Sequence, residues 1–454
     1  MKSFLLKSSI FLFFFIVLLW IFFDPYIIPF QYVFFLKFGS NYFYFGLDGI
    51  SLFFLFLTSF FIPLCILFNW NNNSVSINEY LLCLFFIEIL LFFVFSVLHL
   101  FFFYIFFEAI LIPFFLIIGL NGSRDRKVHA SYLLFFYTLF GSFLMLVSLF
   151  LLYMHTGSTH FQILWGSEYS HIRESLLWIA FFFSFAIKVP IYPFHIWLPE
   201  AHVESPTEGS VILAAILLKV GGYGFLRVLL PMFPNATKYF SSAVIMLCVI
   251  SIVYTSFSTL RQVDIKRIIA YSSIAHMNIA ILGIMICNPL SLAGSLLLMF
   301  GHGIVSGGLF FLIGILYDRF KTKLIFYYSG LFMCMPLFST FFFFFILGNI
   351  SMPGTCNFVG ESLIFFSALS STNLFVLLSI SISIFLCSFY SLFVYNRLTF
   401  GLSNRIIIYN DLNVLEFSIL CPILFFLFLI GIYPKIFFDV LLMSCYNIVS
   451  FFYG

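Results

Sequence analysis

The chain has 454 residues, of which 63% are hydrophobic and 8% are charged, and its formal net charge is +3. Soluble globular chains average roughly a quarter charged residues, so the 20 basic and 17 acidic side chains cannot cover a soluble body of this size. The composition therefore excludes a cytosolic enzyme, a disordered chain and a secreted disulfide scaffold, and the small net charge gives no reason to expect nucleic acid as a partner. We expect an all-α membrane protein that crosses the bilayer many times.

Apolar runs long enough to cross about 30 Å of hydrocarbon predict thirteen transmembrane helices. The first run follows Lys2 and Lys7 but lacks the cleavage site of a signal peptide, so it is predicted to be a retained span. The run at 337–370 is too long for one straight helix and has Pro353 and Gly354 near its middle. The predicted helices lie near 4–23, 47–69, 80–98, 99–119, 131–153, 176–195, 209–231, 240–260, 265–286, 290–317, 337–370, 374–396 and 414–435.

The positive charges of the loops fall mainly on one side of the predicted bundle. If successive helices alternate in direction, thirteen loop cations lie on the side of the N-terminus. The other side receives four, which are Lys37, Arg173, Lys238 and Lys435. By the positive-inside rule, the N-terminus and its side face the cytoplasm or an organelle matrix, and the C-terminus faces the opposite side. We expect a single transmembrane domain over residues 1–454.

Several ionisable side chains fall deep inside the predicted helices. An ionised group at mid-membrane costs a few kcal/mol even on the mildest insertion scale. One explanation is a set of buried ion pairs that lock the bundle, and the other, which we favour, is a proton relay. Arg227 lies near the end of its helix and is expected to be an interfacial anchor, whereas Glu88 is a less certain member of the set. The predicted relay residues are Glu108, Lys188, Lys219, His276, His302 and Glu361.

Two of the predicted helices are interrupted beside these charges. Pro190 and Pro193 follow the first buried lysine, and Pro353 and Gly354 precede the last buried glutamate. Interrupted helices at corresponding places in two halves of a chain are typical of inverted-repeat transporters. The two breaks lie five spans apart, so the second copy would run in the opposite direction. We therefore expect two inverted five-helix repeats, at about 80–231 and 240–396.

The two buried histidines have different neighbours in the sequence. His276 follows Ser272 by one helical turn, so the serine hydroxyl is expected to orient the imidazole ring. His302 lies between Gly301 and Gly303. This small-residue face is expected to let a neighbouring helix approach closely.

The sequence predicts no cofactor or metal site on this chain. The nine Cys are scattered singly, without metal-ligand spacing. His195, Glu200 and His202 are poor zinc candidates, because Pro199 interrupts any helix that would align them. The glycine cluster at 221–224 lies inside an apolar span and lacks the strand–turn–helix setting of a dinucleotide site.

One long motif resembles a known family. Residues 184–227 read SFAIKVPIYPFHIWLPEAHVESPTEGSVILAAILLKVGGYGFLR, which is similar to the signature stretch of subunit 4 of NADH:ubiquinone oxidoreductase (respiratory complex I) of the plant and protist mitochondrial type. The resemblance runs from about residue 45 to the C-terminus. Further matching stretches are FGLDGISLFF (45–54), YIFFEAILIP (104–113), LRQVDIKRIIAYSSIAHMN (260–278), GHGIVSGGLFFLIGILYDR (301–319), MPGTCNFVGE (352–361), YNRLTFG (395–401) and GIYPKIFFD (431–439).

The resemblance implies roles for the six buried groups. Glu108 and Lys188 look like the buried acid–lysine pair of the first repeat, and Lys219 looks like the central lysine. The remaining positions match the two bridging histidines and the terminal glutamate beside the second break. Two departures stand out: one span, where the family usually has two, precedes the Leu47-Asp48-Gly49 motif, and Glu208 replaces a residue that is usually small.

The resemblance also implies a function and a location. It implies a proton-translocating, antiporter-like membrane-arm subunit of the inner mitochondrial membrane, with its N-terminus on the matrix side and driven by ubiquinone reduction elsewhere. NADH, FMN, iron–sulfur clusters and ubiquinone are expected on partner subunits, with none on this chain. The expected partners are other complex I subunits, especially neighbouring antiporter-like ones, and membrane lipids. Two alternatives remain: a subunit of a multi-protein sodium/proton antiporter, and a structural membrane-arm subunit that does not pump.

Overall fold

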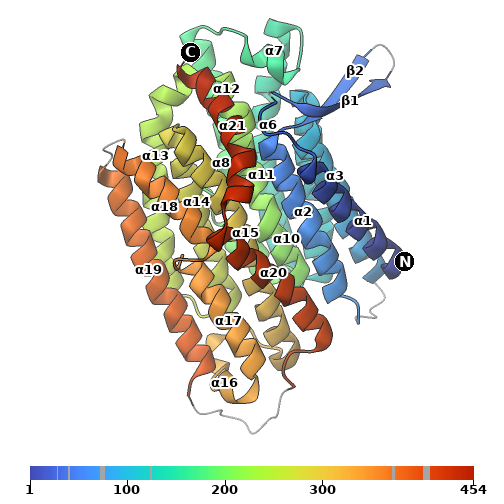
Figure 1. Ribbon diagram of the computed structural model, residues 1–454, viewed down its shortest axis with the longest axis vertical. Helices are drawn as coiled ribbons and strands as arrows, with labels where there is room; N and C mark the ends of the chain where they lie inside the picture. Colours follow the sequence, from blue (N-terminus) through green and yellow to red (C-terminus); the bar gives the residue numbers. More distant parts are fainter. Residues whose placement is uncertain are drawn as a thin grey trace.

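Long apolar helices packed side by side make up almost the whole of the chain, and a small β-hairpin lies at one end of the bundle (Figure 1). The computed structural model describes residues 1–27, 29–38, 41–71, 77–122, 125–370, 374–401 and 410–453. We call the end of the bundle that carries the hairpin and the C-terminus the upper face. The opposite end, which carries residues 261–264 and 321–335, is the lower face.

The elements of the first half lead from α1 to α12. They are α1 (Lys2–Ile21), β1 (Gln31–Phe38), β2 (Asn41–Leu47), α2 (Gly49–Phe68), α3 (Ile77–Ser96), α4 (Leu100–Ala109), α5 (Leu111–Asn121), α6 (Lys127–Thr156), α7 (Phe161–Trp165), α8 (His171–Lys188), α9 (Trp197–Glu204), α10 (Thr207–Ile212), the π-helical turn η1 (Leu213–Leu217), α11 (Leu218–Gly224), the π-helical turn η2 (Phe225–Leu229) and α12 (Leu230–Met232).

The second half is almost entirely α-helical. Its elements are α13 (Pro234–Leu260), α14 (Ile265–Ile286), α15 (Pro289–Phe320), the 3-10 turn η3 (Ile325–Tyr327), α16 (Leu331–Cys334), α17 (Pro336–Asn349), α18 (Cys356–Ser370), α19 (Leu374–Thr399), α20 (Val414–Ile432) and α21 (Lys435–Tyr453).

The described helices make thirteen crossings of the bundle. Twelve helical segments are long and apolar enough to span a membrane individually. The helix α8 and the pair α17–α18 add two crossings, whereas α20 and α21 run in the same direction and share one. Along that shared crossing Phe426 of α20 packs against Phe60 of α2, and Phe437 of α21 packs against Phe53, nearer the upper face. The all-α membrane architecture predicted from the sequence is confirmed.

The last crossing is longer than its predicted range of 414–435. The helix α21 was not predicted, because its mean hydropathy is 1.5 against 2.5 for α20. Lys435, which the sequence analysis places in a loop on the side of the C-terminus, is instead the first residue of α21. The charge count on that side therefore includes one cation that belongs to a helix.

The hairpin of β1 and β2 was not predicted either. Its strands pair antiparallel, with Phe35 opposite Tyr44, and Phe45 of β2 bridges to Val97 at the end of α3. Aromatic residues suit a pleated strand, but the sequence analysis assigned no structure between the first two apolar runs. The hairpin covers the upper ends of α2 and α3.

Both predicted interruptions are present. The helix α8 ends at Lys188, and residues 189–196 are non-helical before α9 begins at Trp197. The second break lies between Asn349 and Cys356, where Gly354 has a φ of 92°. The helix α8 runs toward the lower face and α17 runs toward the upper face, so the two breaks have opposite directions (Figure 1).

The helix α15 lies at the centre of the bundle, and the apolar stretch with which it would span the membrane is buried. The glycines beside His302 let its neighbours approach, as predicted. A Cβ atom on Gly301 would lie 2.7 Å from Asn357 Oδ1 of α18, and one on Gly303 would lie 3.1 Å from the Ala215 carbonyl oxygen. His302 is therefore held between the helix of Lys219 and the second broken helix.

We predict that Gly431→Ala destabilises the protein by about 1–3 kcal/mol, the usual cost of overpacking. A Cβ atom at this position of α20 would lie 2.1 Å from the Gly354 carbonyl oxygen, so the second break would have to move. The measurement is the thermal midpoint of the assembled complex. Gly166→Ala is the matched control, because the nearest atom to its added Cβ lies 3.8 Å away. Equal midpoints for the two variants would contradict this packing argument.

Candidate functional site

Lys219 lies on a helix whose hydrogen-bonding pattern is irregular on both sides of it. The π-helical turns η1 and η2 flank α11, and π turns often mark functional positions in helices. The side chain is fully buried, and its ammonium donates to the Ala214 carbonyl, five residues earlier, within η1. The Nζ atom also lies 2.9 Å from His302 Nδ1. The wide turn thus holds the ammonium against the imidazole.

Two further contacts extend this chain of groups to the second break. The rings of His302 and His276 have their centroids 5.7 Å apart and are inclined by 38°. His276 Nδ1 lies 3.0 Å from Glu361 Oε1, and both side chains are buried. Four of the six predicted relay residues therefore form one contiguous series, in the order Lys219, His302, His276 and Glu361.

The second nitrogen of His276 has partners that the sequence analysis missed. His276 Nε2 lies 3.6 Å from Cys387 Sγ of α19. The Cys387 thiol donates to the carbonyl of Asn349, the last residue of α17, over 3.2 Å, and Tyr390 Oη donates to the sulfur over 3.0 Å. The series therefore contacts the second helix break directly. Cys387 and Tyr390 are one turn apart on an apolar helix, a pattern that gives no sequence signal of its own.

The predicted orienting role of Ser272 is not seen. Its hydroxyl donates to the Ile269 carbonyl over 2.8 Å, along its own helix. A serine inside a helix commonly bonds in this way to the preceding turn. The ring of His276 is instead held by Glu361 and Cys387.

Glu108 and Lys188 form a separate group. Lys188 Nζ donates to the Phe107 carbonyl over 2.8 Å and lies 3.0 Å above the centroid of the Phe107 ring. Within the described part of the chain, neither Glu108 carboxylate oxygen has a hydrogen-bond partner. The two charges are close enough to act on each other electrostatically. The structure therefore brings them together as neighbours, without a direct ion pair.

Arg227 is not the interfacial anchor that its position in the sequence suggests. It is buried, and its Nη1 atom lies 2.7 Å from Asp48 Oδ2. The ring of Phe30 packs against its guanidinium at 4.5 Å. Asp48 also accepts a hydrogen bond from the Ser51 backbone N–H and so caps α2. This ion pair joins α2 to the upper end of the helix that carries Lys219.

Glu88 and the possible metal ligands are the last of the groups that the sequence analysis considered. Glu88 is fully buried, and neither of its oxygens has a hydrogen-bond partner among the residues that the structure describes. Over the same residues, no group of three or more His, Cys, Asp or Glu side chains lies close enough together to hold a metal ion.

The fold and the buried series define a class of protein. Residues 97–387 match the family model described as NADH:quinone oxidoreductase/Mrp antiporter, transmembrane. A chain of the Mrp complex from Dietzia sp. has the same fold, with a TM-score of 0.86 at 17% identity over 100% of this chain and 94% of that one. The protein is an antiporter-like, multi-pass membrane subunit.

Longer matches identify the family more narrowly. The chain is 49% identical to NADH-ubiquinone oxidoreductase chain 4 of Arabidopsis thaliana over 98% of its own length and 91% of that protein. It also matches a chain of respiratory complex I from Thermus thermophilus with bound NADH, with a TM-score of 0.92 at 26% identity over 100% of this chain and 96% of that one. The chain belongs to the NADH-ubiquinone oxidoreductase chain 4 family, whose members place it in mitochondria.

We predict that Arg227→Met destabilises the assembled protein by about 3–5 kcal/mol, the usual cost of leaving one partner of a buried ion pair uncompensated. The uncompensated charge would be the Asp48 carboxylate, which is buried. The thermal midpoint of the complex is the measurement. In the control variant, Arg267→Gln, the lost pair with Glu200 has side chains 29% and 26% exposed, and such pairs contribute about 0–1 kcal/mol. Similar decreases in the thermal midpoint of the two variants would show that the buried Arg227–Asp48 pair contributes no more to stability than an exposed pair.

Proposed function

We propose that this chain carries protons across the inner mitochondrial membrane as a membrane-arm subunit of NADH:ubiquinone oxidoreductase. Transport would be driven by ubiquinone reduction in other subunits of the complex. The observation that carries this proposal is the contiguous buried series from Lys219 through the two histidines to Glu361. Groups of this kind are costly at membrane depth and characteristically form proton relays there.

The series has the chemistry that proton transfer requires. A charged Lys219 donates toward His302 Nδ1, and an imidazole that accepts a proton on one nitrogen can release one from the other. The two rings are close enough to exchange a proton through a small rotation or one water molecule. His276 then delivers the proton to Glu361, whose Oε1 atom lies 3.0 Å from its Nδ1. Each transfer moves one proton and breaks no bond between heavy atoms.

Glu108 and Lys188 would act on this series through their position at the first break. A Cβ atom on Gly221 would lie 3.2 Å from Lys188 Cβ, so the end of α8 packs directly on the helix of Lys219. We infer that the state of this acid–lysine pair biases the charge of Lys219. The opposite directions of the two breaks support the two inverted repeats, at about 80–231 and 240–396, and these repeats would give the pair and Glu361 corresponding places.

We propose an orientation in the membrane on the basis of the distribution of charge. Most loop cations, among them Lys127, Arg261 and Arg267, belong to the lower face, which we therefore assign to the matrix. The C-terminus would then face the intermembrane side. We expect the partners to be other complex I subunits, especially neighbouring antiporter-like subunits, and membrane lipids. NADH, FMN, iron–sulfur clusters and ubiquinone would be bound by those partner subunits.

The two alternatives have less support. A sodium/proton antiporter subunit would share this fold, but the likeness to the Mrp chain is at 17% identity, far below the 49% of the chain 4 relative. A structural subunit without pumping has no need of four ionisable groups in contact, because apolar replacements of such groups usually cost little stability.

The first test of the function is Lys219→Ala. We predict that this variant abolishes proton pumping and leaves assembly largely intact, because the ammonium begins the series and its loss cannot be replaced by a neighbour. The measurement is the proton-to-electron ratio of the assembled complex in membrane vesicles. Lys435→Ala is the matched control, since this lysine is exposed at the break between α20 and α21. An unchanged ratio in Lys219→Ala would refute the proposal.

The second test is Glu361→Gln. The amide oxygen can keep the hydrogen bond to His276, but the side chain cannot accept the proton. We expect the pumping rate to fall by about two orders of magnitude or more, the typical contribution of a positioned proton acceptor. Glu168→Gln is the control, because its carboxylate is exposed in the loop between α7 and α8 at the upper face, away from the series. A pumping rate equal to that of the control would remove Glu361 from the relay.

A further inference from the structure

The sulfur of Cys387 lies at the centre of a cluster of polar groups beside the second helix break. Its thiol donates to the Asn349 carbonyl over 3.2 Å, and Tyr390 Oη donates to the sulfur over 3.0 Å. Two nitrogens each lie 3.6 Å from the same sulfur, Nδ2 of Asn349 and Nε2 of His276. These four residues come from α14, α17 and α19, and each is at most 5% exposed. One sulfur atom therefore joins three helices of the bundle.

The Asn349 carbonyl needs a hydrogen-bond donor from outside its own helix. In a regular α-helix this oxygen would accept from the backbone N–H of residue 353, four positions later. That residue is Pro353, which has no backbone N–H. A backbone carbonyl without a partner is costly at membrane depth. The Cys387 thiol supplies the missing hydrogen bond, so the end of α17 depends on a side chain of α19.

The thiol carries one hydrogen atom and has two possible acceptors. A thiol is both a weak donor and a weak acceptor. When Nε2 of His276 carries a hydrogen, the imidazole donates to the sulfur and the thiol bonds to the Asn349 carbonyl. When Nε2 has no hydrogen, it is an acceptor and competes with that carbonyl for the thiol. The direction of the thiol hydrogen therefore depends on which nitrogen of His276 is protonated.

The groups that face His276 make its two nitrogens change roles. Glu361 of α18 lies at its Nδ1 atom, Cys387 of α19 lies at its Nε2 atom, and His302 of α15 lies beside its ring. An imidazole that donates from Nδ1 to the Glu361 carboxylate can leave Nε2 without hydrogen. Once a proton has entered the ring and the Nδ1 hydrogen has passed to Glu361, the neutral ring carries its hydrogen on Nε2 instead. Passage of a proton therefore reverses the role of the nitrogen that faces the sulfur.

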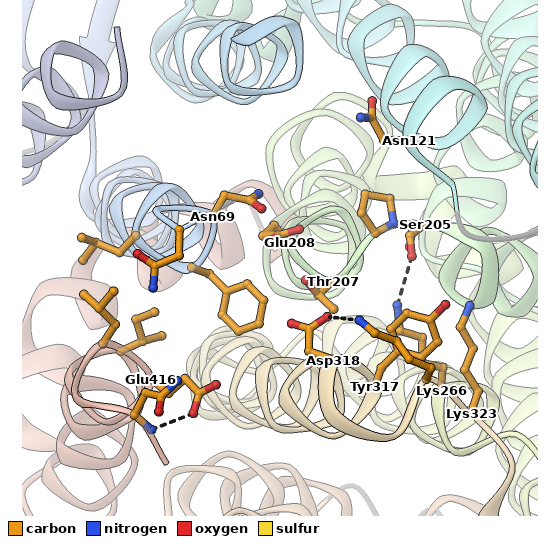
Figure 2. A pocket seen from close by; sticks show the side chains of 18 residues that line it. Asn69, Asn121, Ser205, Thr207, Glu208, Lys266, Tyr317, Asp318, Lys323 and Glu416 are labelled. Carbon is orange, nitrogen blue, oxygen red and sulfur yellow. Dashed lines mark hydrogen bonds and ion pairs between the residues drawn. The ribbon is translucent and has the colours of Figure 1, made fainter. Parts of the chain in front are cut away.

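This cluster lies apart from the polar space of the lower face. There, polar groups such as Asn69 and Asp318 line a cavity of about 630 Å³ (Figure 2), and a polar cavity of that size can hold water. None of the described residues around Cys387 lines this cavity. Cys387 itself is 3% exposed. Its thiol therefore bonds to protein atoms, and the choice lies between a carbonyl oxygen and an imidazole nitrogen.

We propose that Cys387 is a positioning residue of the relay, which couples the protonation of His276 to the second helix break. While Nε2 of His276 has no hydrogen, the thiol donates to it and releases the Asn349 carbonyl. When Nε2 gains a hydrogen, the thiol returns to the carbonyl, and Tyr390 holds the sulfur in place in both states. Only the thiol hydrogen turns, and no covalent bond forms or breaks. This inference rests on the proposed relay and adds the contact through which the relay acts on the backbone.

The test compares Cys387→Ala with Cys387→Ser in the assembled complex. Alanine removes the partner of both the carbonyl and the imidazole. We expect the pumping rate to fall about tenfold, the lower end of the cost of losing a group that fixes a histidine tautomer at metal sites. Serine donates and accepts in the same two directions, so Cys387→Ser should recover most of the rate. The matched control is Cys248→Ala, because Cys248 is also buried but lies on α13, outside the relay helices.

A second readout observes the thiol directly. Infrared difference spectra between the resting complex and the complex turning over with NADH would contain the S–H stretching band of Cys387, assigned by its disappearance in Cys387→Ser. We expect this band to shift during turnover, because a carbonyl oxygen and an imidazole nitrogen weaken the S–H bond to different extents. A thiol with a purely structural role would keep one acceptor and an unshifted band. If Cys387→Ala does not assemble, this measurement decides the question.

The outcomes separate this inference from the proposed function. In Lys219→Ala no proton reaches His276, so the Cys387 band should stay at its resting position while electron transfer continues in uncoupled vesicles. An unshifted band in the unmodified complex during pumping, or a pumping rate in Cys387→Ala equal to that of Cys248→Ala, would overturn the coupling and leave the relay standing. Failure of the proposed function would be seen instead as unchanged pumping in Lys219→Ala.

Discussion

A fully buried lysine whose ammonium nitrogen lies 2.9 Å from an imidazole nitrogen is the interaction on which the rest of this structure depends. Membrane hydrocarbon makes an isolated charge there expensive, and the protein compensates with local backbone features. The π-helical turn before Lys219 presents a carbonyl oxygen to the ammonium, and the glycines beside His302 bring three helices together around it. The irregular helices are therefore part of the site and not defects of the bundle.

The second helix break is in contact with the other end of the series, just as the π-helical turn is in contact with Lys219. Asn349 ends α17, and its carbonyl accepts a hydrogen bond from the Cys387 thiol, which in turn lies beside His276. A change in the protonation of His276 or Glu361 can therefore alter the hydrogen bonding of the backbone at the break. Non-helical backbone at this depth is tolerated only when it is buried in protein or lines a cavity, and in this protein it is packed against α20 at Gly431. Proton position and helix geometry are linked at this point by direct contacts.

The sequence predicted most of the apolar helices, both breaks and six of the ionisable groups inside the bundle, because each of these is a local property of one segment. It could not predict which segments are neighbours in space. The separation of Glu108 and Lys188 from the other four groups, and the pairing of Arg227 with Asp48, depend on how the helices pack. The same holds for Lys266, which follows a loop in the sequence but is covered by the end of α9 in the fold. The helix α21 was missed for a different reason, since its hydropathy is lower than that of the spans around it.

A double-mutant cycle on the rate of pumping tests the central claim most directly. Glu361→Gln, His302→Gln and the double variant would be compared in the assembled complex, with electron transfer measured in parallel. Residues that act in one series show strongly non-additive effects. We therefore predict that the double variant pumps no more slowly than the worse single variant. A double variant whose loss equals the product of the two single losses would show that these residues act independently, and would contradict a relay that runs from Lys219 through His302 to Glu361.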